Sequence, residues 1–135
     1  ATGNTYGTLY NWYAVESGKL CPEDWHVPSK DEWSVLIKHL GGNTVAGGHL
    51  KETGTTHWNS PNAGATNSTG FNALPGGERL DDGTFEGLKN KGYWWSASEA
   101  NETYAWGWLL LYGYEGIGSY DNDKKNGFSV RCMKD

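Results

Sequence analysis

Apolar side chains recur at helical spacing in one segment of the chain, directly after a motif that starts helices. The apolar positions of this segment lie three or four residues apart, which places them on one helix face: Trp33, Leu36, Ile37 and Leu40. Ser29 precedes them as a candidate N-cap, and Glu32 follows three residues later, as in a capping box. Gly41 and Gly42 end the pattern. The segment therefore predicts a helix at 30–40.

The neighbouring segments carry weaker patterns. Residues 6–15 are dense in aromatic side chains, and their period fits either a short helix or a strand. Residues 25–27 favour an extended conformation, because Pro28 restricts the residue before it. A second, shorter helix is predicted at 44–52, although the two glycines inside it weaken the pattern.

The middle and the end of the chain differ in their patterns. Turn residues dominate from 53 to 91, and the apolar residues among them indicate a folded loop pinned to the core: Trp58, Phe71, Leu74 and Phe85. The last third alternates between apolar and polar residues and predicts four strands, at 93–98, 105–112, 115–120 and 127–132, with turns at Gly113 and at 121–123. An early helix followed by antiparallel strands predicts an α+β domain, with one or two helices, a small antiparallel sheet and long ordered loops.

The composition adds constraints to this picture. The chain has 135 residues, with eight Trp, eight Tyr, twenty Gly and a formal net charge of −5. Its length fits a single domain over 1–135, and its aromatic and glycine content indicates a loop-rich fold held by aromatic clusters. The mild acidity argues against a nucleic-acid partner. The longest apolar run, 108–112, has the length of a strand, so we expect no membrane insertion of this domain.

The two cysteines, Cys21 and Cys132, lie near opposite ends of the chain. This spacing does not fit a CxxC redox or zinc motif. The cysteines either form a disulfide, which would contribute about 4–5 kcal/mol through the entropy of the unfolded chain, or they are buried free thiols. An oxidising compartment fits the rest of the composition.

Catalytic chemistry finds little support in the sequence. The four histidines lie early in the chain and without a metal-binding or catalytic spacing: His26, His39, His49 and His57. The neighbouring acidic residues lie in turn-forming contexts, and adjacency alone does not give the geometry of a glycosidase. We therefore expect no enzyme and no cofactor. A structural calcium ion is the one metal that the loops could hold, with candidate ligands at Asn67, Asn72, Asp81, Asp82 and Glu99.

Five blocks of the chain occur together in one known family. They are YGTLYNWYAV, LCPEDWHVPSKDEW, GFNALPGG, GYWWSASE and NGFSVRC, in this order. From about residue 6 to 135 the chain resembles the Fibrobacter succinogenes major paralogous domain, which is common in surface and lipid-anchored proteins of Bacteroidetes. The strand region that usually precedes the first block is not found, so we expect the N-terminal part of the family domain to be missing.

That family is similar in turn to formylglycine-generating sulfatase-modifying domains and to C-type lectins. The resemblance implies a C-type-lectin-like fold and a secreted or lipid-anchored bacterial protein at the cell surface. C-type lectins join a cysteine near the first helix to one in the last strand, so the resemblance also implies a disulfide between Cys21 and Cys132. The formylglycine-generating relatives use active-site cysteines, and that activity is not carried over because both cysteines have this structural explanation.

Some members of the family resemble the variable proteins of diversity-generating retroelements, which diversify a C-terminal stretch inside a constant lectin-like frame. The resemblance implies a set of ligand-binding residues within 104–123. Changes at the adenines of one codon type, AAC, can produce each residue of this set. The set is Tyr104, Gly107, Leu109, Leu111, Gly113, Tyr114, Gly116, Gly118, Tyr120, Asp121 and Asp123. The interleaved residues would form the frame: Ala105, Trp106, Leu110, Tyr112 and Ile117. The alternative is that family members are rich in Tyr and Asn here without diversification.

Recognition by an exposed surface is the function that these observations favour. Tyr and Trp give large contact areas with few rotors, and Gly and Ser give adaptability. Strand alternation predicts that Trp106 and Leu110 lie in the core, and that Trp108 lies there too because it points to the same side of the strand. The residues predicted to be exposed are Leu109, Leu111, Tyr114 and Tyr120. We expect an adhesin-like domain for a protein or glycan ligand, whose capture Tyr114→Ala and Tyr120→Ala would abolish. The alternatives are an assembly domain without its own ligand, a hydrolase with carboxylates clustered in a pocket, and an accessory domain of a carbohydrate-active enzyme.

Overall fold

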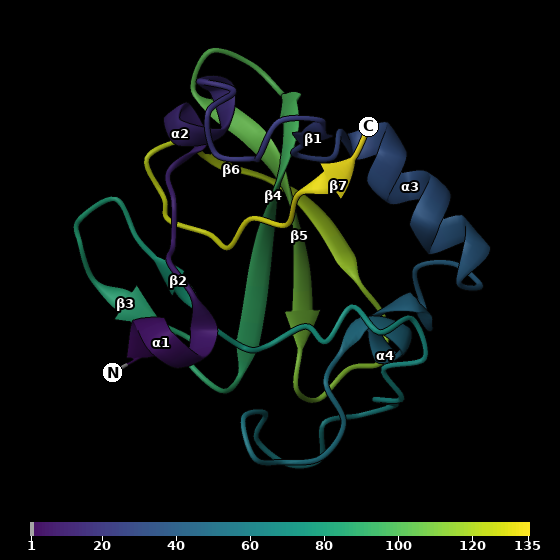
Figure 1. Cartoon of the computed structure of the whole chain (residues 1–135). Coiled ribbons are helices and arrows are strands. Elements are labelled where there is room, and N and C mark those ends of the chain that lie inside the picture. Colours follow the sequence, from purple (N-terminus) through teal and green to yellow (C-terminus); the bar gives the residue numbers. More distant parts are fainter. Residues whose placement is uncertain (1) are drawn as a thin grey trace.

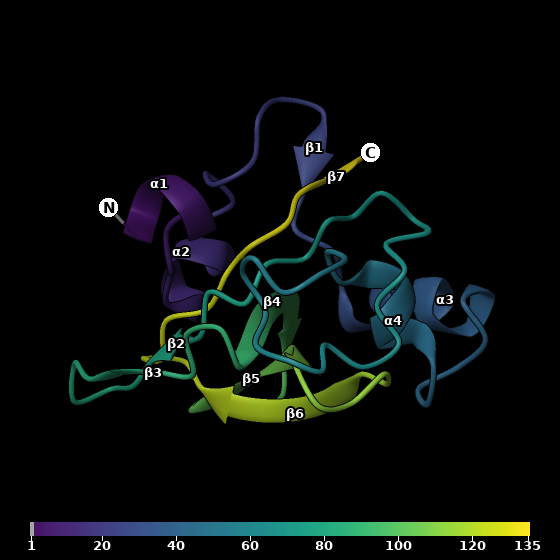
Figure 2. The same ribbon diagram turned by 90° about the horizontal axis from the view of Figure 1, so that it is seen from below.

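The chain folds into an α+β domain around one small sheet, as predicted. The computed structural model describes residues 2–135. Its elements are α1 (Thr2–Tyr6), α2 (Trp12–Glu16), β1 (Trp25–His26), α3 (Lys30–His39), α4 (Ala46–Leu50), β2 (Glu78–Arg79), β3 (Phe85–Glu86), β4 (Lys91–Glu99), β5 (Tyr104–Leu111), β6 (Gly118–Asp123) and β7 (Met133–Lys134). Strands β4, β5 and β6 form the central antiparallel sheet in that order, while β1 pairs with β7 and β2 with β3. Figures 1 and 2 show α3 and α4 on one side of this sheet, and α1 with the β2–β3 hairpin on the other.

Helix α3 forms where the sequence predicts it. The Ser29 hydroxyl accepts a hydrogen bond from the backbone N–H of Glu32, and the Glu32 carboxylate accepts one from the backbone N–H of Ser29. This reciprocal capping box satisfies two backbone donors that the helix start leaves without partners. Trp33 and Ile37 are buried against the sheet, so the predicted apolar face of this helix is confirmed.

The central sheet buries aromatic side chains on both of its faces, because successive residues of a strand point to opposite sides. Trp94 packs on the α3 side, in a cluster with Trp33, Ile37, Trp108 and Leu110. The next residue, Trp95, packs on the other side, in a cluster with Trp12, Val15, Ala105 and Phe128. The sheet is therefore the centre of two cores, which we call the α3 face and the α2 face.

Helix α4 is shorter than the predicted helix at 44–52, and its two glycines have a structural reason. A Cβ atom on Gly47 would lie 2.0 Å from the carbonyl oxygen of Gly116, and one on Gly48 would lie 2.2 Å from that of Gly64. Glycine therefore lets two loops approach the helix to backbone contact. The glycines that weaken the helical pattern in the sequence are the residues that allow this packing.

The N-terminal segment resolves the ambiguity of residues 6–15. It contains the end of α1, then a single bridge between Tyr10 and Phe128, then α2 with Asn11 as its N-cap. The pattern was ambiguous because the segment contains both helical and extended residues. Trp58 is fully buried in the long loop that follows, as predicted, but Phe85 is 72% exposed on the β2–β3 hairpin, so its predicted place in the core is wrong.

Three other predictions at the C-terminal end need correction. The predicted strand at 127–132 makes only isolated bridges, to Tyr10, Arg79 and Trp94, because it crosses several segments instead of following one partner. Residues 121–123, predicted as a turn, form the end of β6, and the turn follows at 124–126. The strand predicted at 115–120 begins later, at Gly118.

A disulfide joins Cys21 to Cys132 with a Cα–Cα distance of 5.8 Å, which confirms the predicted pairing. It links the segment before β1 to the segment before β7, across 111 residues of sequence. Such bonds are typical of proteins from oxidising compartments. No helix within residues 2–135 is long and apolar enough to cross a membrane.

Candidate functional site

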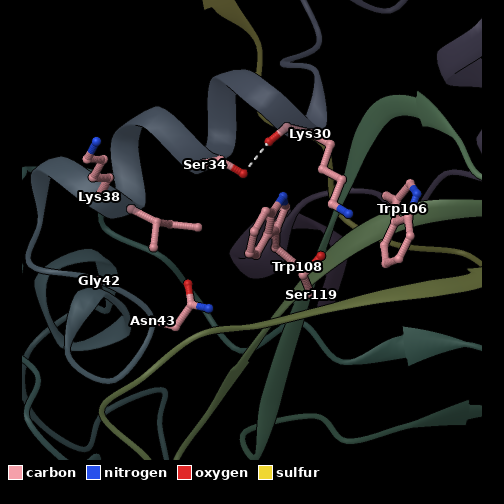
Figure 3. A pocket seen from close by; sticks show the side chains of 9 residues that line it. Lys30, Ser34, Lys38, Gly42, Asn43, Trp106, Trp108 and Ser119 are labelled. Atoms are coloured by element: carbon pink, nitrogen blue, oxygen red, sulfur yellow. Dashed lines mark hydrogen bonds between the residues drawn. The ribbon is translucent and has the colours of Figure 1, made fainter.

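A groove of about 630 Å³ lies between α3 and the central sheet. Its walls come from the helix, from the loop after it and from strands β5 and β6, as Figure 3 shows. The lining residues are Lys30, Ser34, Ile37, Lys38, Gly42, Asn43, Trp106, Trp108 and Ser119. Its volume is within the range of small-molecule binding pockets.

The helix side of the groove is polar because of a spacing within α3. Lys30, Ser34 and Lys38 follow one another at intervals of four residues, so they share one face of the helix beside the buried apolar face. The Ser34 hydroxyl donates to the carbonyl of Lys30, and the backbone N–H of Lys30 donates to the Ser98 hydroxyl. The ammonium group of Lys30 lies 3.4 Å from the ring centroid of Trp106, in a cation–π contact.

The sheet side of the groove is aromatic and comes from one face of β5 and β6. In an antiparallel ladder, directly paired residues share a face, and Trp106 pairs with Asp121 while Trp108 pairs with Ser119. Trp108 is 3% exposed, so its predicted core position is confirmed. Trp106 is only partly buried and lines the groove, so its predicted core position is wrong: the apolar face of α3 packs against Trp108, whereas the Lys30 side chain lies over Trp106.

Two polar atoms of the groove wall have no hydrogen-bond partner among the described residues. They are the indole nitrogen of Trp108 and the hydroxyl of Ser119, and each exposes less than 1 Å². Three other buried tryptophans satisfy this need, because the indole nitrogens of Trp12, Trp58 and Trp95 donate to backbone carbonyls. The indole nitrogen of Trp33, on α3 and outside the groove lining, also lacks a partner within residues 2–135. Buried polar atoms without a partner are uncommon in folded proteins and call for an explanation at each occurrence.

The register of β5 and β6 divides the predicted ligand-binding set between the two faces of the sheet. Tyr104, Asp121 and Asp123 share the α3 face with Trp106, because Tyr104 pairs with Asp123 and Trp106 with Asp121. Leu109, Tyr120 and, by alternation, Leu111 share the opposite face. Gly113, Tyr114 and Gly116 lie in the loop between the strands. The set therefore does not form one surface.

Some members of the predicted set are not available to a ligand at all. Gly107 and Gly116 are buried, so their predicted display is wrong. A Cβ atom on Gly107 would lie 3.2 Å from the ring of Phe128, because the segment after β6 crosses the sheet there. Gly118 is partly buried, with the ring of Tyr120 next to its Cα. Tyr104, Tyr114 and Tyr120 are exposed, Leu109 and Leu111 are partly buried, and the ligand-binding role of all five stays a prediction.

A buried lysine holds the loop between β5 and β6. The Lys51 ammonium group donates to the carbonyls of Ala63, Leu111 and Tyr114 at 2.8–3.0 Å. Burial lowers the pKa of Lys51 to about 8, and the nearby Glu115 carboxylate acts in the opposite direction. The backbone of this loop is therefore anchored, while the Tyr114 side chain extends into solvent.

The histidines do not contribute to the groove. His26 bonds to Asp135 and Glu32, His57 to Glu52, and His49 to Ser68. The candidate calcium ligands are also used elsewhere: Asp82 bonds to Thr84, Glu99 to Lys124, and Asn67 to Asn72. Within residues 2–135 no three His, Cys, Asp or Glu side chains gather closely enough to hold a metal ion.

A second pocket, beside the β2–β3 hairpin, contains two carboxylates. Glu78 and Glu86 line it together with the exposed Phe85 and Leu88. The Lys91 ammonium group lies 3.2 Å from a Glu78 oxygen and 3.0 Å from a Glu86 oxygen. Burial raises the pKa of Glu78 against the opposing effect of Lys91, and the hydrogen bond from Lys91 is the main cause that lowers the pKa of Glu86. The three groups form an ion triad at the base of the hairpin.

Sequence reasoning missed the helix side of the groove. The repeat of Lys30, Ser34 and Lys38 was visible as a polar stripe, but a polar stripe on a helix is usually a solvated face. Only the packing of α3 against the sheet makes it the wall of a groove. Asn43, in the loop after the helix, carried no signal in the sequence.

The comparison with protein families is decisive on one point. The family model of the Fibrobacter succinogenes major domain matches residues 1–134. The chain belongs to this family. The match covers all the elements that build the groove, from α3 to β6, so the groove is formed within the family domain. No curated protein and no solved structure matches the chain.

Proposed function

We propose that this domain is a non-enzymatic binding module, exposed on a bacterial cell surface, that receives its ligand in the groove between α3 and the β5–β6 strands. The observation that carries the proposal is the pair of buried, unpartnered polar atoms in the groove wall, on Trp108 and Ser119. A bound ligand that accepts hydrogen bonds would satisfy both. The disulfide supports an extracellular location, since such bonds persist in oxidising compartments.

The composition of the groove supports binding over catalysis. Its lining residues include no histidine, cysteine, aspartate or glutamate, and the Ser34 hydroxyl donates to the backbone carbonyl of Lys30 and not to a base. The lining instead combines two tryptophan rings with amide, hydroxyl and ammonium groups. Binding pockets typically have such an aromatic wall with a few polar groups that fix the orientation of the ligand.

A retroelement-variable surface remains part of this proposal, in a narrower form. Among the predicted variable positions, Tyr104, Asp121 and Asp123 share the groove side of the sheet, so changes there would alter the rim next to Trp106. A downstream near-copy of the coding region for 94–132, differing at adenines, would support diversification. Without such a copy, the aromatic content of this stretch is a property of the family frame.

The proposal can be tested with variants on the two faces of the sheet. We expect the wild-type protein to capture a ligand from arrays of glycans and of peptides. The Trp106→Ala variant should bind this ligand at least about tenfold more weakly. The Ser119→Trp variant should not bind it, because the new indole fills the groove. Tyr120→Ala is the matched control, since Tyr120 is exposed on the opposite face. Capture that survives Ser119→Trp but not Tyr120→Ala would refute the groove as the binding site.

A hydrolase is the second candidate, because Glu78 and Glu86 form a pair of carboxylates in a pocket with pKa values displaced in opposite directions. Lys91 bonds to both carboxylates, which favours a structural role. Hydrolysis of nitrophenyl glycosides that Glu78→Gln abolishes would establish the enzyme. Absence of turnover together with a loss of stability in Glu78→Gln would establish the structural role.

A further inference from the structure

The groove presents hydrogen-bond donors that lack acceptors. The indole N–H of Trp108 can only donate, and the Ser119 hydroxyl has no partner within residues 2–135. In Figure 3 the indole nitrogen of Trp108 points toward the α3 side of the groove. A ligand that satisfies this wall must therefore bring acceptor oxygens.

The same wall carries positive charge that the protein does not neutralise. Lys30 and Lys38 form no ion pair with any carboxylate of the described chain, although the chain has a net charge of −5. The Lys30 ammonium group lies over the Trp106 ring instead. Asp121 and Asp123 share the sheet face with Trp106, at the rim of the groove, but neither is among the lining residues. The Lys30 ammonium group, which lies between the two indoles in Figure 3, favours an anionic acceptor beside the two unpartnered donors, because hydrogen bonds to charged oxygens are stronger than neutral ones. Lys38 lines the other end of the groove.

The remaining surface of the groove suits a sugar ring. Trp106 offers the flat apolar face of its partly buried indole once the Lys30 ammonium group leaves it, and Ser34 and Asn43 line the same groove with polar groups. A pyranose has the matching pattern, with an apolar C–H face and a polar edge of hydroxyl groups. A volume of about 630 Å³ accommodates one or two such rings. An acidic peptide would supply the anion but not the flat apolar face.

We propose that the groove binds an acidic saccharide, whose carboxylate or sulfate oxygens accept hydrogen bonds from Trp108 and Ser119 while Lys30 and Lys38 neutralise the charge. This proposal rests on the groove being the ligand site of the domain. Each of the two donor atoms exposes less than 1 Å², so the proposed binding requires a side chain of the groove to move. We expect this to be Lys30, which crosses the groove between the two indoles in Figure 3. Such rotamer changes are common when partners bind.

The test is a titration of the ¹⁵N-labelled chain, followed at the indole N–H signals. The probes are D-glucuronate, its uncharged methyl ester, glucose 6-sulfate, an acetylated glutamyl dipeptide, and acetate and sulfate alone. We expect the acidic sugars to bind at least about tenfold more tightly than the methyl ester and to shift the Trp108 indole signal. The indole signals of Trp12, Trp58 and Trp95 serve as internal controls, because each donor already has a carbonyl partner.

Matched variants check the charge contribution. Lys38→Gln should weaken glucuronate binding about threefold to tenfold and leave the methyl ester unaffected, since an exposed charge contributes modestly. Lys19→Gln, an exposed lysine outside the groove, should change neither. Ser119→Ala should weaken the acidic sugars while the protein stays folded, so the result does not depend on altering a core tryptophan. Whether glucuronate or the sulfate ester binds more tightly identifies the preferred oxyanion, and either order supports the proposal.

Each other outcome overturns it. Equal affinity for the methyl ester would mean that the groove binds neutral sugars, in which case the proposed function stands and the acidic preference is wrong. Tighter binding of the dipeptide would replace the saccharide by an acidic peptide. A response to acetate or sulfate equal to that of the sugars would indicate an adventitious ion only. No response to any probe, while an array ligand still depends on Trp106, would also refute the acidic saccharide and leave the groove as the site.

Discussion

The two faces of the central sheet each bury a tryptophan, but only one of the two indole N–H groups has a hydrogen-bond partner within the described chain. On the α2 face, Trp95 is fully buried, and its indole N–H donates to the carbonyl of Tyr10. On the α3 face, Trp108 is buried to nearly the same extent, but its indole N–H has no partner among residues 2–135. Both residues belong to the central strands, and they pack into different cores.

This difference separates the frame of the domain from its proposed binding surface. The α2 face is closed by the N-terminal segment and by the crossing of residues 127–129. The carbonyl of Tyr10 accepts from the Trp95 indole, and that of Ser96 accepts from the Trp12 indole. On the α3 face, residues of α3, α4 and the loops pack over Trp94, Trp108 and Leu110, and the groove stays open beside Trp106. Polar atoms without partners among the described residues occur on this face in Trp33, Trp108 and Ser119, and the proposed ligand would satisfy the two that line the groove, those of Trp108 and Ser119.

The largest expected effect on stability comes from removing the disulfide between Cys21 and Cys132. Replacing both cysteines by serine should lower the free energy of unfolding by about 4–5 kcal/mol, because the disulfide closes a loop across 111 residues. Urea unfolding of the double variant and of reduced wild-type protein measures this loss. Lys38→Gln in the groove is the control and should leave the unfolding curve unchanged. A loss below about 1 kcal/mol would show that the unfolded chain gains little freedom when the bond is removed.

The next prediction sharpens the contrast between frame and surface. Trp95→Ala should destabilise the domain by about 3–5 kcal/mol, because it empties a fully buried site. Trp106→Ala should cost less than about 1 kcal/mol, because this ring is partly exposed in the groove. Equal losses of unfolding free energy, measured side by side in urea, would mean that Trp106 belongs to the frame.

A matched pair of milder changes isolates the hydrogen bond. Trp95→Phe and Trp108→Phe remove similar volumes, but only the first leaves a carbonyl, that of Tyr10, without its donor. We expect Trp95→Phe to cost about 1–3 kcal/mol more than Trp108→Phe. Thermal and urea unfolding of the two variants give the difference directly. A Trp108→Phe variant as unstable as Trp95→Phe would imply that Trp108 has a partner in solution, such as an ordered water molecule.

The smallest effect is a pH dependence that should affect stability and not the groove. His26 lies between Asp135 and Glu32, and hydrogen bonds to both, the larger from Asp135, raise its pKa above 6.5. Because the folded pKa is raised, the stabilisation is complete below pH 6.5 and is lost as the pH rises through the folded-state pKa. Unfolding free energies from pH 5 to 8 should decline modestly in wild-type protein and stay level in His26→Gln. A decline of equal size in the variant would assign the effect to another group.

Much of the domain was predictable because its signals are local. Ser29 and Glu32 cap α3 through atoms three residues apart, and the face of Trp33 and Ile37 follows from helical spacing. Alternation identified β4 and β5 for the same reason. The pairing of Cys21 with Cys132 came from the family resemblance, since two cysteines so far apart carry no local signal. The segment 127–132 failed as a predicted strand because its partners come from three separate parts of the chain.

The groove and the division of the predicted ligand-binding set depended on tertiary structure. Alternation showed that Tyr104 and Tyr120 lie on strands, but only the register between β5 and β6 placed them on opposite faces. In the same way, the sequence by itself determined that Lys30, Ser34 and Lys38 share a helix face. It took the packing of the apolar face of α3 against Trp108, with the Lys30 side chain over Trp106, to turn that polar face into the wall of a groove. Caps and strand alternation arise from contacts within a few residues, whereas the surface that binds is formed by residues some ninety positions apart, which only the folded chain brings together.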